Sequence, residues 1–195
     1  LRYLLLDFKY YICNAFGPKI MTEKQHRIQA LIHSIVNYIQ DHGAGMYGVD
    51  LTLDKLKGMD LSEEKLIDLP PQGTRHDEVL KNAIAGIDAP ELQDIKTHLA
   101  ATKDDLMWLE DTGLFYPNSD DVGDGYKKCN LHTLLIGPAA CGYQHLGFRL
   151  GIFMLGPRTL YRDHKHDAPE LYLNLSKRSG WRFGTPDWQD YPAGS

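Results

Sequence analysis

The sequence predicts an α+β protein in which a helical N-terminal region precedes a β-rich region. Residues 1–110 carry apolar side chains at helical spacing, most clearly between residues 28 and 39. Beyond residue 111 the sequence changes to glycines, aromatic residues and short apolar runs bounded by glycine. Such runs are typical of the antiparallel strands of a sandwich or a barrel. We therefore assign residues 1–110 to one region and residues 111–195 to a second.

Local signals place the helices. Residues 1–12 follow helical spacing from the first position, so we expect natural residues to be missing before Leu1. A second helix is expected to begin after Thr22, a favourable N-cap, and to stop at Gly43. Short helices are expected at 54–57 and 62–67, and longer ones at 77–84 and from Pro90 along an apolar stripe that ends at Leu109. Strands are expected at 131–137, 148–155, 171–175 and 180–183.

Composition excludes several functional classes. The 21 Lys and Arg residues are outnumbered by 26 Asp and Glu residues, and no basic run could neutralise the phosphates of a nucleic acid. No stretch reaches the roughly 18 apolar residues of a membrane span. The cysteines, Cys13, Cys129 and Cys141, have spacings that match neither a disulfide framework nor a CxxC site.

Residues 161–172 carry the clearest chemical signal. His164, His166 and Glu170 form the pattern HxHxxxE, and an extended strand would place all three on one face. Tyr172 shares that parity, whereas the opposite face would hold Leu171, Leu173 and Leu175. Two imidazoles and a carboxylate suit Zn²⁺, Fe²⁺, Mn²⁺ or Ni²⁺. The pattern predicts a metal site, and the alternative is a solvated hairpin.

HxHxxxE after Gly156-Pro157 resembles the first motif of the cupin superfamily. With a tyrosine at each end of the stretch and Gly180-Trp181 beyond it, residues 131–195 are similar to the cupin-type dimethylsulfoniopropionate (DMSP) lyases. The resemblance implies a double-stranded β-helix (jelly-roll) barrel preceded by a helical cap. It also implies another histidine ligand. Because no histidine follows Glu170, we expect an incomplete barrel and further strands after residue 195. His132 and His145 are alternative ligands, but we interpret each as a strand or loop histidine.

The resemblance implies a carbon–sulfur lyase that cleaves DMSP by β-elimination to dimethyl sulfide and acrylate. The substrate is a small sulfonium carboxylate. The implied metal is Zn²⁺, with Fe²⁺, Mn²⁺ or Ni²⁺ as alternatives. Its ligands would be His164, His166 and Glu170. Tyr172 would be the general base, and Tyr161 would position the substrate or assist.

Aromatic faces would hold the sulfonium cation; the candidates are Trp181, Trp188 and Tyr143. Without the resemblance, Tyr172 would be interpreted as a strand residue with its ring in the core. The alternatives are another metal-dependent cupin, such as a dioxygenase or an isomerase, and a cupin that binds a small molecule without turnover. Similarity to the long, capped lyases implies a periplasmic location, and a cytoplasmic one is the alternative.

Overall fold

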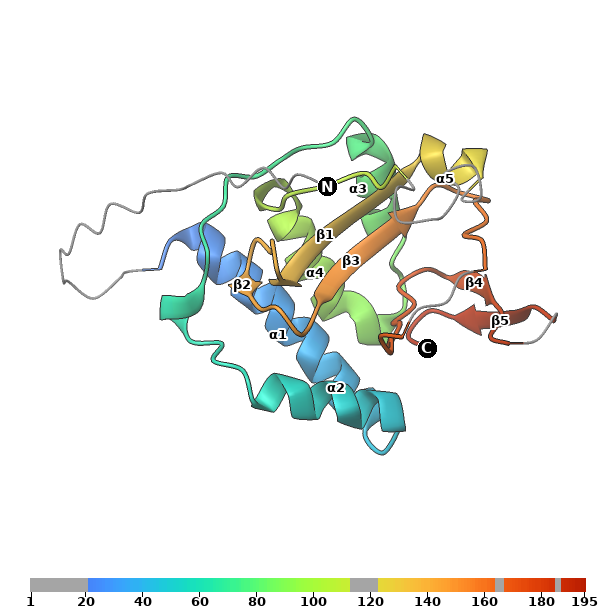
Figure 1. Cartoon of the computed structure of the whole chain (residues 1–195). Coiled ribbons are helices and arrows are strands. Elements are labelled where there is room, and N and C mark those ends of the chain that lie inside the picture. Colours follow the sequence, from blue (N-terminus) through green and yellow to red (C-terminus); the bar gives the residue numbers. More distant parts are fainter. Residues whose placement is uncertain (1–20, 113–122, 164–166, 185–186) are drawn as a thin grey trace, which may run out of the picture.

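The computed structural model describes residues 21–112, 123–163, 167–184 and 187–195. Helices and small sheets make up these residues (Figure 1), as expected for an α+β protein. The helices are α1 (Glu23–Gly43), α2 (Tyr47–Lys57), α3 (Asp77–Ala85), α4 (Gln93–Thr102) and α5 (Asp124–Lys128), with 3₁₀ turns η1 (Glu63–Lys65), η2 (Pro90–Leu92) and η3 (Lys103–Asp105). The strands are β1 (Asn130–Gly137), β2 (Tyr143–Gln144), β3 (Leu150–Leu155), β4 (Arg178–Trp181) and β5 (Gln189–Pro192).

Helix α1 begins at a capping box. The backbone N–H of Gln25 donates to the hydroxyl of Thr22 at 3.2 Å, and the Gln25 side chain accepts from the Thr22 N–H at 3.0 Å. These bonds satisfy backbone donors that a helix start leaves without a partner. Most of the predicted stripe is buried, and Val36 is partly buried; the buried members are Ile28, Leu31, Ile32, Ile35 and Ile39. The expected N-cap, stripe and end at Gly43 are all confirmed.

The two longest strands, β1 and β3, form a sheet with the short strand β2, in the order β2-β1-β3. Strand β1 runs antiparallel to β3 and parallel to β2. Alternate residues of β1, Leu131, Thr133 and Leu135, are buried, whereas His132 and Leu134 between them are only partly buried. One face of the sheet therefore belongs to the core, and α1 and α4 lie on that side (Figure 1).

The two predicted regions share one core. A single cluster of buried apolar side chains includes residues of α1, α4, β1 and β3. Isolated bridges also join the helical region to the sheet, with Leu66 opposite Tyr143 and Leu109 opposite His132. Residues before position 110 therefore both pack against the sheet and pair with it at isolated positions.

The two sheets form no closed barrel within the described residues. Several other features differ from what the sequence predicted. Residues 171–175 are not a strand, although the backbone N–H of Asn174 donates to the oxygen of Ser195 and the backbone oxygen of Asn174 accepts from the N–H of Gly194. The helix expected to continue to Leu109 ends near residue 105, because Leu106 and Trp108 instead pair through their backbones with Gln72.

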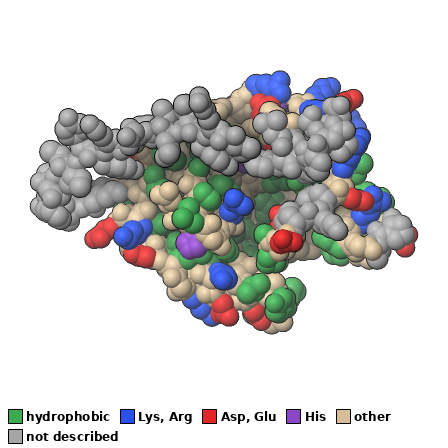
Figure 2. All heavy atoms as spheres, in the orientation of Figure 1, with side chains coloured by type: hydrophobic (Ala, Val, Ile, Leu, Met, Phe, Trp, Pro, Cys, Tyr) green, Lys and Arg blue, Asp and Glu red, His purple; other side chains and the backbone are tan. Residues whose placement is uncertain are grey.

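The surface is mixed in charge and also carries exposed apolar side chains. On the face that Figure 2 shows, acidic and basic side chains are interspersed, which agrees with the absence of a basic run in the sequence. Among the described residues, no helix combines the length and the apolar character needed to span a bilayer.

Gly142 provides a test of the packing between α1 and the sheet. A Cβ at this position would lie 2.3 Å from the backbone oxygen of Leu135 and about 3.1 Å from the Ile32 side chain. We expect Gly142→Ala to lower the free energy of unfolding by roughly 1–3 kcal/mol, the usual cost of overpacking. Urea denaturation measures the change. Gly73→Ala, where the added Cβ meets nothing within 4 Å, is the matched control, and equal stabilities of the two variants would contradict the packing.

Candidate functional site

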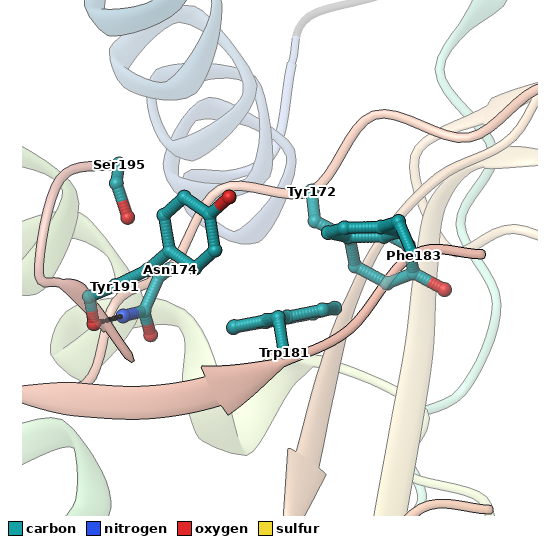
Figure 3. Close-up of a pocket in the computed structure, with 6 residues that line it drawn as sticks. All are labelled: Tyr172, Asn174, Trp181, Phe183, Tyr191 and Ser195. Carbon is teal, nitrogen blue, oxygen red and sulfur yellow. Dashed lines mark hydrogen bonds between the residues drawn. The ribbon is translucent and has the colours of Figure 1, made fainter. Parts of the chain in front are cut away.

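A pocket of about 140 Å³ lies between residues 172–174 and the β4–β5 hairpin. Its lining consists of Tyr172, Asn174, Trp181, Phe183, Tyr191 and Ser195. Figure 3 shows Tyr172 and Phe183 toward one end of the pocket, beside the indole of Trp181, and Asn174, Tyr191 and Ser195 toward the other. The lining contains no charged side chain, so the pocket is an aromatic cleft with a few neutral polar groups.

Three of these rings form a continuous aromatic wall. The centroids of Tyr172 and Trp181 are 4.8 Å apart, and Phe183 stacks on Trp181 with the centroids 5.9 Å apart. The negative faces of such rings attract a cation placed within about 6 Å of their centroids. The sequence identified Trp181 and Tyr172. It missed Phe183 and Tyr191, although Phe183 lies two residues after Trp181 and thus shares its parity in an extended segment.

The hydroxyl of Tyr172 points away from this wall and donates a hydrogen bond to Glu170 Oε2 at 2.6 Å. The two side chains therefore lie on one side of the chain, as strand parity predicted, although this segment is not a strand. Partial burial raises the pKa of Tyr172 well above its usual range, and the Glu170 carboxylate and the neighbouring Tyr161 add to the shift. Burial and these neighbours therefore disfavour the phenolate form of Tyr172.

Tyr161 lies in a second aromatic group on the same side of the sheet as Phe153. Its ring stacks on Tyr126 with the centroids 5.2 Å apart and lies 5.3 Å from the ring of Phe153. The hydroxyl of Tyr126 donates to Asp111 at 2.6 Å, which fixes the ring against which Tyr161 stacks. Because Tyr161 also acts electrostatically on Tyr172, the two predicted tyrosines lie in one neighbourhood.

The predicted metal ligands are only partly described. His164 and His166 lie outside the described residues, and among those described no cluster of three His, Cys, Asp or Glu side chains could hold a metal ion. Glu170 is exposed beside the pocket and offers carboxylate oxygens there. A carboxylate with two imidazoles four and six residues earlier is a donor set that suits Zn²⁺ and related divalent ions.

Trp188, which the sequence predicted to contact the cation, is not among the residues that line this pocket. The guanidinium of Arg182 covers its ring at 4.8 Å from the centroid. Arg182 is held there by Asp163, which accepts from its Nε at 2.9 Å. One face of Trp188 is thus already occupied by a cation of the protein itself.

Comparison with known proteins adds to this geometry. A family model described as DMSP lyase matches residues 68–195, more than half of the chain. The chain belongs to the DMSP lyase family. Comparisons with curated proteins and with solved structures gave no match. Family membership supports a DMSP-cleaving function, and the match covers the pocket, Glu170 and all of the predicted catalytic tyrosines.

Tyr143, the third predicted contact of the DMSP cation, is a core residue. It lies on β2 with only 2% of its surface exposed. Its hydroxyl donates to the backbone oxygen of Leu61 at 2.8 Å and accepts from the side chain of Gln29 at 3.1 Å. These bonds join α1, the segment after α2 and the sheet, so the role of Tyr143 is structural. Sequence alone could not separate a buried aromatic residue from a pocket aromatic residue.

We expect Tyr143→Phe to lower the free energy of unfolding by about 1–2 kcal/mol, because the carbonyl of Leu61 loses its donor, and to leave the KM for DMSP unchanged. Burial raises the pKa of Tyr143 above its ordinary value of 10.0. The wild-type chain should therefore lose this contribution as the pH rises above about 10, since the unfolded tyrosine ionises first. The variant should lack that loss. Urea denaturation at neutral and alkaline pH measures the loss of stability and its dependence on pH. A raised KM for DMSP would indicate that Tyr143 contributes to substrate binding.

Proposed function

We propose that this protein cleaves DMSP by β-elimination and releases dimethyl sulfide and acrylate. The observation that carries the proposal is the position of Tyr172. Its ring forms part of an uncharged aromatic pocket, and its hydroxyl bonds to Glu170 at the edge of that pocket. The ring of Tyr172 can therefore contact a bound cation while its oxygen is available for proton transfer. The family match independently supports DMSP as the substrate.

The pocket suits the sulfonium end of the substrate. Tyr172, Trp181 and Phe183 offer ring faces and edges at mutual distances of 4.8 and 5.9 Å. Desolvated cation–aromatic contacts of this kind are each worth roughly 2 kcal/mol. Dimethyl sulfide leaves as a neutral molecule, so the pocket needs no general acid, and none of its lining residues is a carboxylic acid or a histidine.

The elimination requires one base. We assign the base to Tyr172, whose oxygen removes a proton from the carbon next to the substrate carboxylate. The electron pair of that C–H bond forms the carbon–carbon double bond, and the C–S bond breaks with its electrons on sulfur. Before the proton of Tyr172 is lost, its hydroxyl donates to Glu170 at 2.6 Å, and Tyr161 lies close enough to position the substrate or to assist.

A divalent cation would be held by His164, His166 and Glu170. We propose Zn²⁺ as this cation in preference to Fe²⁺, Mn²⁺ or Ni²⁺. Such an ion supplies positive charge that acidifies the C–H bond beside a carboxylate and favours the anion of a nearby phenol. This charge would offset the effect of burial and of Glu170, which by themselves raise the pKa of Tyr172. We also propose a cupin barrel as the complete fold; the antiparallel β1–β3 and β4–β5 pairs support it.

Tyr172→Phe tests the base. The substitution keeps the ring in the pocket and removes the oxygen, so kcat for dimethyl sulfide release should fall by at least ~10²-fold while KM changes little. Headspace detection of dimethyl sulfide from the full-length protein measures it. Tyr47→Phe, at a tyrosine that is 84% exposed, is the matched control and should keep full activity. Loss of activity in Tyr161→Phe alone would move the base to Tyr161, and a wild-type protein that released no dimethyl sulfide would refute the lyase function.

Metal content tests the ligand set. We expect the full-length protein to carry a bound divalent metal and the double variant His166→Ala/Glu170→Ala to lose it, because removal of two ligands leaves too few donors. Elemental analysis after gel filtration gives the metal-to-protein ratio. His33→Ala, on α1 and away from the motif, is the control. Equal metal content in the wild type and the double variant would contradict the assignment.

A further inference from the structure

Asn174 connects every segment that lines the pocket. We propose that it is a positioning residue, which holds the aromatic wall in place beside Tyr172. It is 93% buried, with an exposed fraction of 7%, and lies two residues after Tyr172. The sequence by itself assigned this asparagine no role.

Its side-chain amide makes four hydrogen bonds. The Nδ2 group donates to the backbone oxygens of Tyr191 at 3.0 Å and Pro192 at 2.8 Å (Figure 3 marks the Tyr191 bond). The Oδ1 atom accepts from the Ser176 N–H at 3.1 Å and from the Ser179 hydroxyl at 3.0 Å. Both donors and both acceptor positions of the amide therefore have partners.

The backbone of Asn174 adds two further links. Its N–H donates to the oxygen of Ser195 at 2.9 Å, and its oxygen accepts from the Gly194 N–H at 2.8 Å. Gly194 is held in turn by α1, since its oxygen accepts from the Tyr38 hydroxyl at 2.9 Å. One residue thus ties the Tyr172 segment to β4, to β5 and to the C-terminal turn.

Only an amide of this length satisfies the arrangement. Aspartate has the same shape, but its second oxygen would face the carbonyl oxygens of Tyr191 and Pro192 with no proton to share. It would also place a charge in a buried position. The hairpin would then move away from residue 174, and with it Tyr191 and Trp181, whereas the bond between Glu170 and Tyr172 does not involve Asn174.

This inference rests on the proposed function, since it assigns Asn174 to binding of the substrate cation rather than to proton transfer. The sulfonium charge is present in the bound substrate and disappears as the C–S bond breaks. Contacts to that charge therefore lower KM without raising kcat. A residue that positions the aromatic wall should change KM, and a residue that only stabilises the fold should change neither constant in the folded protein.

The experiment compares Asn174→Asp in the full-length protein with Asn82→Asp, the same substitution at an exposed position of α3. We expect the KM for DMSP to rise at least about tenfold in Asn174→Asp with a smaller change in kcat, because several contacts are lost together. Calorimetric affinity for the analogue in which trimethylammonium replaces dimethylsulfonium should fall in parallel, since cation–aromatic attraction does not depend on the central atom. Asn82→Asp should match the wild type in both.

Ser179→Ala is the milder second variant and removes only one of the bonds to Oδ1. Its KM should rise by about two- to fivefold, and it decides the question if Asn174→Asp does not fold. A lowered melting temperature with unchanged KM and unchanged analogue affinity would overturn the proposal. These outcomes are distinct from failure of the proposed function, because that failure would be the absence of dimethyl sulfide release by the wild type.

Discussion

The burial of one helix face against one sheet face is the interaction on which the rest of the structure depends. The stripe of α1 contributes five buried side chains, and each is worth roughly 1.5–3 kcal/mol when removed from water. This contact needs close approach, and Gly142 allows it because a Cβ there would meet both the backbone of Leu135 and the α1 side chains. Leu66 and Leu109 then extend the same sheet from within the helical region.

The pocket lies outside this core and is connected to it by a few contacts. Leu173 and Leu175 pack partly against the core, and Tyr38 of α1 holds Gly194 of the C-terminal turn. Tyr172 and Asn174 alternate with these leucines in the sequence and line the pocket together with residues of the β4–β5 hairpin. The hairpin has its own antiparallel pairing, with Ser179 opposite Tyr191 and Trp181 opposite Gln189. A site assembled from short segments of this kind depends on side-chain hydrogen bonds, because regular strand pairing covers only part of it.

The two ends of the proposed site differ in charge. The pocket lining is uncharged and aromatic, which favours a weakly hydrated cation over a strongly hydrated one. The edge near Glu170 is anionic, and burial together with that carboxylate raises the pKa of the Tyr172 phenol. For the proposed base, added positive charge would offset this shift, and the two histidines of the motif are the proposed ligands of a cation that supplies it.

Signals between residues close in sequence determined much of this protein. The capping box at Thr22, the period of the α1 stripe and the glycine-bounded strands 131–137 and 148–155 were predictable, because helix caps and apolar periodicity are local properties. The HxHxxxExY pattern likewise pointed to the DMSP lyase family, which the match over residues 68–195 confirmed. Only the tertiary structure decided which aromatic residues face the pocket. Tyr143 is buried, Trp188 is covered by Arg182, and Phe183 and Tyr191 line the cleft instead. These differences depend on partners far away in the chain, such as Gln29 and Leu61 for Tyr143 and Asp163 for Arg182, and no local pattern encodes them.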